Sequence, residues 1–270
     1  MTPELADSFL ALHTSDRPLL MPNAWDRGSA VMFESLGFEA IATTSSGFAA
    51  TLGRLDGNVS RDEAIAHSAE LAGAVGVPVS ADLENCFADD PAEVAETVRQ
   101  AIEAGLAGCS IEDYSGPETD DIYDAGFAAE RVAAAAEAAH SGERRLVLTG
   151  RAENHVHDRD DLPDTISRLQ SYQEAGADVL FAPGLRTLDQ IREVLASIDR
   201  PLNVLVVRGM PTVSELAEIG VSRISVGGSL AFAAYGAAAT AARELKDSGT
   251  YEYGETTAIG AKATREAFGR

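Results

Sequence analysis

Residues 77–85 read VPVSADLEN, a short run with β-branched valines that stops at two carboxylates. On an extended backbone alternate side chains point to the same side, so Asp82 and Glu84 are expected to share one face. Two hard oxygen ligands at the end of a buried strand suit Mg²⁺ or Mn²⁺ better than Zn²⁺. The same pair could instead be solvated at the strand end or cap a helix that begins near Pro91, because acids with this spacing are common.

Further apolar runs lie on both sides of this segment and alternate with stretches of helical spacing, such as 91–104 and 166–175. Several helical stretches close on a glycine before the next run, as helix ends often do. The predicted strands are 19–22, 40–44, 77–81, 108–111, 146–149, 179–182, 202–207 and 224–226. Eight units of strand and then helix predict a (β/α)8 TIM barrel. A doubly wound open sheet is the alternative, but the chain lacks a G-x-G-x-x-G turn after its first strand.

We see no linker or domain boundary, so residues 1–270 are expected to form one barrel domain with a short C-terminal extension, about 248–270. Residues 255–268 could form a last helix. The helix predicted for residues 230–246 is rich in alanine. Small residues allow close helix approach, so this helix is either an oligomer contact or an ordinary barrel helix.

The formal net charge is −22, and Lys246 and Lys262 are the only lysines. Such a surface repels nucleic acid and anionic lipid, so neither is an expected partner. A small anionic substrate would need a local cation. The chain has no apolar run long enough for a membrane span and no signal-peptide pattern at its start, so we expect a cytoplasmic protein. Its two cysteines, Cys86 and Cys109, are too few for a disulfide scaffold.

In a barrel the C-terminal ends of the strands meet at one mouth, where active sites lie. The second predicted strand ends in hydroxyls, the third and fourth end in acids, and the fifth ends in a cation. Together they predict a site for a metal and an anion. The residues at these ends are Thr44, Ser45, Ser46, Gly47, Asp82, Glu84, Glu112 and Arg151, with Asn203 inside the seventh strand.

Seven short strings, met in order between residues 21 and 228, resemble the isocitrate lyase and phosphoenolpyruvate mutase superfamily. They are PNAWD (22–26), GFEAI (37–41), TSSG (44–47), ADLEN (81–85), SIED (110–113), GAD (176–178) and GVSRISVGG (220–228). The resemblance implies a (β/α)8 barrel, often with the last helix exchanged between subunits of a homodimer or homotetramer. It also implies a Mg²⁺-dependent enzyme that acts on small 2-oxo acids or their adducts.

Carried over to this chain, the resemblance gives roles to single residues. Asp82, Glu84 and Glu112 correspond to the metal-site acids, with Glu84 standing where the family usually has Asp. Asp56 corresponds to the acid on the loop that gates the mouth, and Arg151 to the arginine that pairs with the substrate carboxylate. The segment 44–47 corresponds to the part that holds the 2-oxo acid, and we expect Asn203 to contact the substrate as well.

One departure narrows the activity. Lyases of the superfamily carry a K-K-C-G-H loop after the fourth strand, whose cysteine serves as acid and base, whereas residues 115–121 here read SGPETDD. This argues against isocitrate or methylisocitrate cleavage by that route. Cys86 is expected to be a small buried side chain rather than a substitute.

The sequence therefore predicts a Mg²⁺- or Mn²⁺-dependent lyase that cleaves a carbon-carbon bond in a small 2-oxo or 2-hydroxy dicarboxylate through an enolate. The alternatives are an oxaloacetate decarboxylase, a phosphonopyruvate hydrolase or mutase, and a binding protein that keeps the 2-oxo acid pocket without catalysis. His155 and His157 follow Arg151 closely and are candidates for an acid or base. The other histidines, His13, His67 and His140, are expected on helix surfaces.

Overall fold

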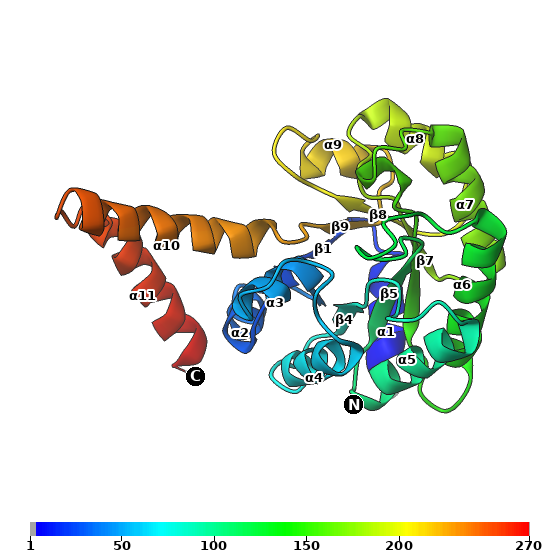
Figure 1. The fold of residues 1–270 in the computed structure, drawn as a ribbon, viewed down its shortest axis with the longest axis horizontal. Helices are drawn as coiled ribbons and strands as arrows, with labels where there is room; N and C mark the ends of the chain where they lie inside the picture. Colours follow the sequence, from blue (N-terminus) through cyan, green and yellow to red (C-terminus); the bar gives the residue numbers. More distant parts are fainter. Residues whose placement is uncertain (1–3, 270) are drawn as a thin grey trace.

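The computed structural model describes residues 4–269 and shows a barrel of parallel strands surrounded by helices (Figure 1). The strands are β1 (Leu19–Met21), β2 (Asn23–Ala24), β3 (Ile41–Thr43), β4 (Val79–Asp82), β5 (Gly108–Glu112), β6 (Val147–Arg151), β7 (Val179–Phe181), β8 (Leu202–Leu205) and β9 (Arg223–Ser225). The helices are α1 (Glu4–Leu12), α2 (Arg27–Ser35), α3 (Ser45–Thr51), α4 (Arg61–Ala72), α5 (Pro91–Glu103), α6 (Ala125–His140), α7 (Leu162–Glu174), α8 (Leu188–Leu195), α9 (Val213–Glu218), α10 (Ser229–Asp247) and α11 (Gly254–Phe268). The predicted (β/α)8 TIM barrel is confirmed.

The first predicted strand, 19–22, is present as β1, and an additional short strand, β2, follows directly after Pro22. β1 pairs with β9, with Leu19 opposite Arg223, whereas β2 pairs with β3, with Asn23 opposite Ala42. The strand order is β1-β9-β8-β7-β6-β5-β4-β3-β2, and every pairing is parallel. Because β1 and β2 are consecutive in the chain, their separate pairings join the two edges of the sheet into a barrel.

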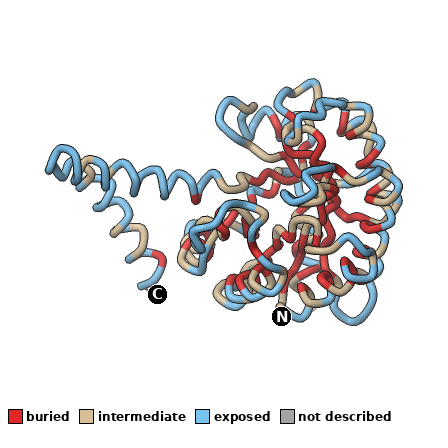
Figure 2. The backbone as a smooth tube through the Cα atoms, in the orientation of Figure 1, coloured by how far each residue is buried: buried red, intermediate tan, exposed pale blue. Residues whose placement is uncertain are grey.

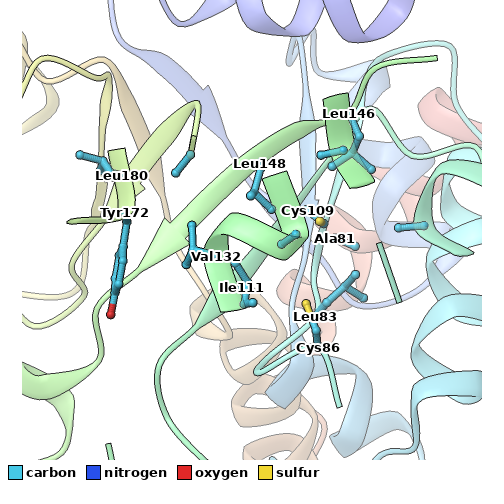
Figure 3. Packing of buried hydrophobic residues seen from close by; sticks show 14 of the residues in the cluster. Ala81, Leu83, Cys86, Cys109, Ile111, Val132, Leu146, Leu148, Tyr172 and Leu180 are labelled. Carbon is cyan, nitrogen blue, oxygen red and sulfur yellow. The ribbon is translucent and has the colours of Figure 1, made fainter. Parts of the chain in front are cut away.

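Most of the apolar core lies between the outer face of the strands and the helices. Figure 3 shows part of it, with Leu83, Cys86, Cys109 and Leu148 packed together. Both cysteines are free and buried, and burial raises the pKa of the Cys86 thiol to about 12. The expected role of Cys86 as a buried apolar side chain is confirmed.

A second apolar cluster lies where α1 packs at the end of the barrel opposite the mouth. It contains Phe9 from α1 and strand residues such as Leu19, Val147 and Val179. Gly108 makes room for this contact, since a Cβ atom there would lie 2.7 Å from Phe9 Cε1 and 2.9 Å from the carbonyl oxygen of Val147. The ring of Phe9 therefore reaches the strands only because residue 108 has no side chain.

The last two helices form an arm on the outside of the barrel. α10 projects away from the strands, and α11 turns back towards α2 (Figure 1). α10 is exposed along most of its length (Figure 2), and Ala231 is its only buried residue within the described chain. Within residues 4–269 no helix has the length and apolar character needed to cross a membrane.

Candidate active site

The alternation of side chains along each strand places polar residues inside the barrel. On β6, Leu148 belongs to the outer core, whereas Thr149 and Arg151 point inward. The same rule directs inward Ser80 and Asp82 on β4, Ser110 on β5, Asn203 on β8, and Arg223 and Ser225 on β9. The cavity that these residues line has a volume of about 180 Å³. It opens at the mouth formed by the C-terminal ends of the strands.

Seven of the predicted site residues line this cavity: Thr44, Ser45, Ser46, Asp56, Asp82, Arg151 and Asn203. The segment after β3 begins α3, with the Thr44 hydroxyl accepting a hydrogen bond from the backbone N–H of Gly47 at 3.3 Å. The N–H of Ser45 donates to Oδ2 of Asp82 at 3.2 Å, and the Thr43 hydroxyl accepts from the N–H of Asp82 at 2.9 Å. The ends of β3 and β4 are thus fixed to each other around one carboxylate.

Three other predicted residues do not line the main cavity. Gly47 is buried behind it, where a Cβ atom would lie 2.5 Å from Cγ2 of Thr44 and 3.0 Å from Cβ of Trp25. Glu84 lies beside Asp82 in a small recess, and Glu112 lies behind Arg151. The expectation that Glu84 shares a face with Asp82 on an extended strand is wrong, because β4 ends at Asp82 and Glu84 has a left-handed φ of 49°.

Arg151 is the cation of the mouth, and acids surround it. Its Nη1 lies 3.1 Å from Oε2 of Glu112 and 3.3 Å from Oδ1 of Asp82, and its Nε donates to Glu153. Burial by itself lowers the pKa of Arg151, but Glu153, Glu112 and Asp82 outweigh this effect and hold the pKa well above its ordinary value. Nη2 of Arg151 has no hydrogen-bond partner among residues 4–269, so it remains available to a ligand.

The carboxylates near Arg151 outnumber the cations, and the pKa values of three of these carboxylates are raised. Burial and repulsion by Asp82 and Asp56 raise the pKa of Glu84 to about 8. Burial also raises the pKa of Glu112 well above its ordinary value, and Arg151 only partly offsets this. Asp56 remains open to solvent at the mouth, yet partial desolvation and the charge of Asp82 raise its pKa. A bound cation would stabilise the ionised forms of these carboxyl groups, so their number around one cavity fits a site that binds a cation.

The three predicted metal ligands, Asp82, Glu84 and Glu112, are not arranged to bind one metal ion directly. No group of three or more His, Cys, Asp or Glu side chains in the described part of the chain is placed to hold a metal ion. The donors that suit Mg²⁺ are present as oxygens, but only Asp82 among the predicted metal ligands lines the main cavity. A metal ion here would therefore rely on water for several of its ligands, as Mg²⁺ commonly does.

The two histidine candidates lie beside the site. The side chain of His155 is buried, with Nδ1 lying 3.1 Å from Oδ1 of Asp160, and His157 stacks on Tyr114 with ring centroids 3.8 Å apart. Neither lines the cavity. The expectation of surface positions is wrong for two other histidines, since His13 and His67 are buried at 3% and 8% exposure. His13 packs inside the barrel end with Arg223, and His67 stacks on Phe48.

The sequence reasoning assigned no role to several residues that lie in the cavity or beside it. Glu153 is a close partner of Arg151, and Asn23 ties β2 to the last loop by accepting hydrogen bonds from the N–H groups of Val226 and Gly227 at 3.0 and 2.9 Å. Arg223 is a charged side chain inside the barrel. Its place as the one charged residue in VSRISV (221–226), a segment otherwise made of valine, isoleucine and serine, was the signal that could have identified it.

The sequence profile of the family described as phosphoenolpyruvate phosphomutase matches residues 9–246. A crystal structure from Burkholderia cenocepacia J2315, of a protein named as a candidate lyase/mutase, is 46% identical with a TM-score of 0.93, covering 97% of this chain and 95% of that one. An uncharacterised protein of Mycobacterium tuberculosis is 35% identical over 89% of each chain.

Lyases and phosphomutases both occur among more distant relatives. The 2-methylisocitrate lyase of Halalkalibacterium halodurans is 28% identical over 74% of this chain and 66% of its own length. Other related proteins bear the names 2,3-dimethylmalate lyase and carboxyvinyl-carboxyphosphonate phosphorylmutase. With a family match across most of its length, the chain belongs to the phosphoenolpyruvate phosphomutase family, within the isocitrate lyase and phosphoenolpyruvate mutase superfamily.

Proposed function

We propose that this protein is a Mg²⁺-dependent lyase that cleaves a carbon-carbon bond in a small 2-oxo or 2-hydroxy dicarboxylate through an enolate. One observation carries the proposal: a single cavity at the barrel mouth is lined by Thr44, Ser45 and Ser46, by Asp82 and by Arg151. These groups supply hydrogen-bond donors, a metal ligand and a cation within one small space. Relatives that are named as lyases support the reaction class.

Asp82 would bind the metal ion, with Glu84 and Glu112 holding water molecules around it. The raised pKa values of Glu84 and Glu112 support this assignment, because a cation would stabilise the ionised forms that burial now disfavours. A bound Mg²⁺ would supply Lewis-acid stabilisation of the negative charge that develops during cleavage. Mn²⁺ has similar ligand preferences and is the alternative ion.

The protein's own groups would orient the substrate. Arg151 is already held by three acids, so its Nη2 can donate to a substrate carboxylate without reorganisation of the side chain. The guanidinium carbon lies 5.2 Å from the ring centroid of Phe181, which supports it from the other side. The hydroxyls of Thr44, Ser45 and Ser46 would fix the 2-oxo or 2-hydroxy end.

Asp56 is the candidate base at the open side of the cavity. It would take the proton of the 2-hydroxy group, the carbon-oxygen double bond would form as the carbon-carbon bond breaks, and the enolate carbon would then take up a proton. Partial desolvation and the charge of Asp82 raise the pKa of Asp56, which makes it a better proton acceptor than an ordinary aspartate.

A binding protein without catalysis is the second candidate. It is favoured by the loop 115–121, which contains no Cys or Lys, and by the burial of both cysteines, which leaves no accessible thiol. Oxaloacetate decarboxylation and carbon-phosphorus cleavage would use the same metal and anion site. Oxaloacetate and phosphonopyruvate are therefore included among the substrates to be tested.

The test is Mg²⁺-dependent release of pyruvate, or of glyoxylate from isocitrate, from oxaloacetate, phosphonopyruvate, 2-methylisocitrate, isocitrate and dimethylmalate. Wild type is compared with Arg151→Ala, Asp82→Asn and the matched control Arg192→Ala, whose side chain is exposed on α8. We expect release from one substrate that is lost in the first two variants and kept in the control. Metal-dependent binding without release from any substrate would favour the binding protein, and Mg²⁺ binding that survives in Asp82→Asn would contradict the metal assignment.

We also propose that the arm of α10 and α11 packs on a second copy of the chain, in a homodimer or homotetramer. Phe232 and Tyr235 of α10 are 52% and 43% exposed, and Ile259 of α11 is 64% exposed. Exposed apolar side chains gathered on one projecting arm mark a surface that packs against another protein chain. Phe232→Asp with Tyr235→Asp should dissociate the assembly in light scattering. Ala133→Asp, on the exposed side of α6, is the control, and an unchanged mass in the double variant would contradict the proposal.

A further inference from the structure

Arg223 is a buried cation without a carboxylate partner. It is the first residue of β9, points into the barrel and is 3% exposed. Its Nε donates to Oδ1 of Asn203 at 3.0 Å, its Nη2 donates to the Thr149 hydroxyl at 3.1 Å, and its Nη1 lies 3.3 Å from Nε2 of His13. Within residues 4–269 it forms no ion pair, and burial lowers its pKa to about 9.

His13 is neutral in this arrangement. Its Nδ1 lies 2.8 Å from the carbonyl oxygen of Phe9 and must donate there, so Nε2 is the acceptor that faces Arg223. Burial and the charge of Arg223 lower the pKa of His13 to about 3. All three partners of Arg223 are therefore uncharged. A buried guanidinium without an anion is costly, so an anion that reaches it should bind well.

Arg223 lines the same cavity as Arg151 and Asp82. Ser80 and Ser110 line it as well, and their hydroxyls form no hydrogen bond with other parts of the described chain. The barrel interior around Arg223 thus combines one uncompensated cation with free hydroxyl donors and no acid. The mouth has the opposite character, because three acids already surround Arg151.

We propose that Arg223, with Ser80 and Ser110, forms an inner subsite for the distal carboxylate of the substrate, so that the cavity selects dicarboxylates over monocarboxylates. The inference rests on the proposed function, which places the reacting 2-oxo or 2-hydroxy end between Arg151 and Asp82. The inner subsite then receives the other end of the same molecule. The volume of about 180 Å³ suits a ligand of only a few carbon atoms, and the lining of this one cavity includes both the mouth residues Arg151 and Asp82 and the inner residue Arg223.

Malate and lactate are the matched probes, because both are stable 2-hydroxy acids and only malate has a second carboxylate. Binding is measured by titration calorimetry in the presence of Mg²⁺. We expect wild type to bind malate about ten- to a hundredfold more tightly than lactate, as a charge-assisted hydrogen bond predicts. Arg223→Met should reduce malate binding to the level of lactate and leave lactate binding unchanged.

Two further variants separate this role from a structural one. Ser110→Ala removes a hydroxyl without an internal partner, so it should weaken malate binding alone, about threefold or more. Arg223→Lys keeps the charge and should retain part of the preference even if the methionine variant does not fold. Arg192→Met, on the surface of α8, should behave as wild type.

The outcomes distinguish this inference from the proposed function. Equal binding of both acids by wild type, or an equal loss of both in Arg223→Met and Ser110→Ala, would overturn the inner subsite while Mg²⁺-dependent turnover by wild type still supported the lyase. If wild type binds neither acid and turns over no substrate, the proposed function and the subsite both fail.

Discussion

The hydroxyl of Tyr172 on α7 donates a 2.6 Å hydrogen bond to Oδ2 of the buried Asp113, just beyond β5. Oδ1 of Asp113 accepts the backbone N–H of Glu153 at 2.8 Å, and Arg168 reaches Oδ2 at 3.1 Å. Because Glu153 in turn pairs with Arg151, a side chain on an outer helix holds the backbone that positions the cation of the mouth. This carboxylate connects the helix layer to the site.

Substitutions of Tyr172 and Asp113 should destabilise the protein to different degrees. Tyr172→Phe removes one donor and should lower the free energy of unfolding by about 1 kcal/mol. Asp113→Ala removes the carboxylate shared by Tyr172, Arg168 and the N–H of Glu153, leaves Arg168 with Asp164 alone as an ion-pair partner, and should cost about 3 to 5 kcal/mol. Urea unfolding followed by circular dichroism measures both, with Tyr251→Phe, whose side chain is 68% exposed, as control. An equal loss of unfolding free energy in the two variants would show that Asp113 does not hold Tyr172, Arg168 and Glu153 together.

Arg131 on α6 holds the loop that carries Glu84. The guanidinium is fully buried, lies 4.2 Å from the ring centroid of Tyr123, and donates to the carbonyl oxygens of Asn85, Ala88, Asp89 and Glu112. The loop contains three left-handed residues, Glu84, Cys86 and Phe87, each of which costs about 1 to 3 kcal/mol unless its surroundings impose it.

Arg131→Met should therefore release this loop. We expect a loss of about 3 kcal/mol in unfolding free energy, faster hydrogen exchange of residues 83–90, and weaker Mg²⁺ binding. Mass spectrometry of exchanged peptides measures the second effect. Arg99→Met, an exposed arginine on α5, is the control. Unchanged exchange in the loop would show that the strained backbone has another support.

Gly108→Ala should destabilise the barrel by about 1 to 3 kcal/mol, because the added methyl group overlaps Phe9 and the carbonyl of Val147. Adding Phe9→Leu should recover part of the loss, since one of the two overlaps is with a side chain and the other is with backbone. Thermal unfolding measures both effects. Gly236→Ala on α10, where a Cβ atom meets nothing within 4 Å, should be neutral or stabilising.

Stability should fall as the pH drops below about 6.5, in part because of His13. The folded state holds the pKa of His13 near 3, whereas the unfolded chain has the ordinary value of 6.5. Between these values the unfolded state binds the extra proton, so the free energy of unfolding decreases on acidification by up to about 1.4 kcal/mol per pH unit. His13→Gln should flatten this dependence between pH 4 and about 6.5. If the unfolding free energy of His13→Gln depended on pH as steeply as that of wild type, the lowered pKa of His13 would not be the cause.

The positions of the strands and the main helices followed from local sequence patterns. Runs such as 77–81 and 146–149 are too apolar for loops, and the glycines that follow the predicted helices adopt the positive φ that ends a helix, 87° at Gly105 and 108° at Gly176. The strand ends with acids, hydroxyls and one arginine could also be identified, because parallel strands with helical crossovers bring those ends to one mouth.

Only the tertiary structure decided which of these groups meet. Pairing between residues far apart in the chain determines three features: the separate partners of β1 and β2 on either side of Pro22, the left-handed turn at Glu84, and the acids around Arg151. The inward direction of Arg223 depends on the register of β9 in the closed barrel. Local periodicity determines what a segment becomes, whereas barrel closure and register determine its neighbours, and a single sequence contains no direct record of those distant contacts.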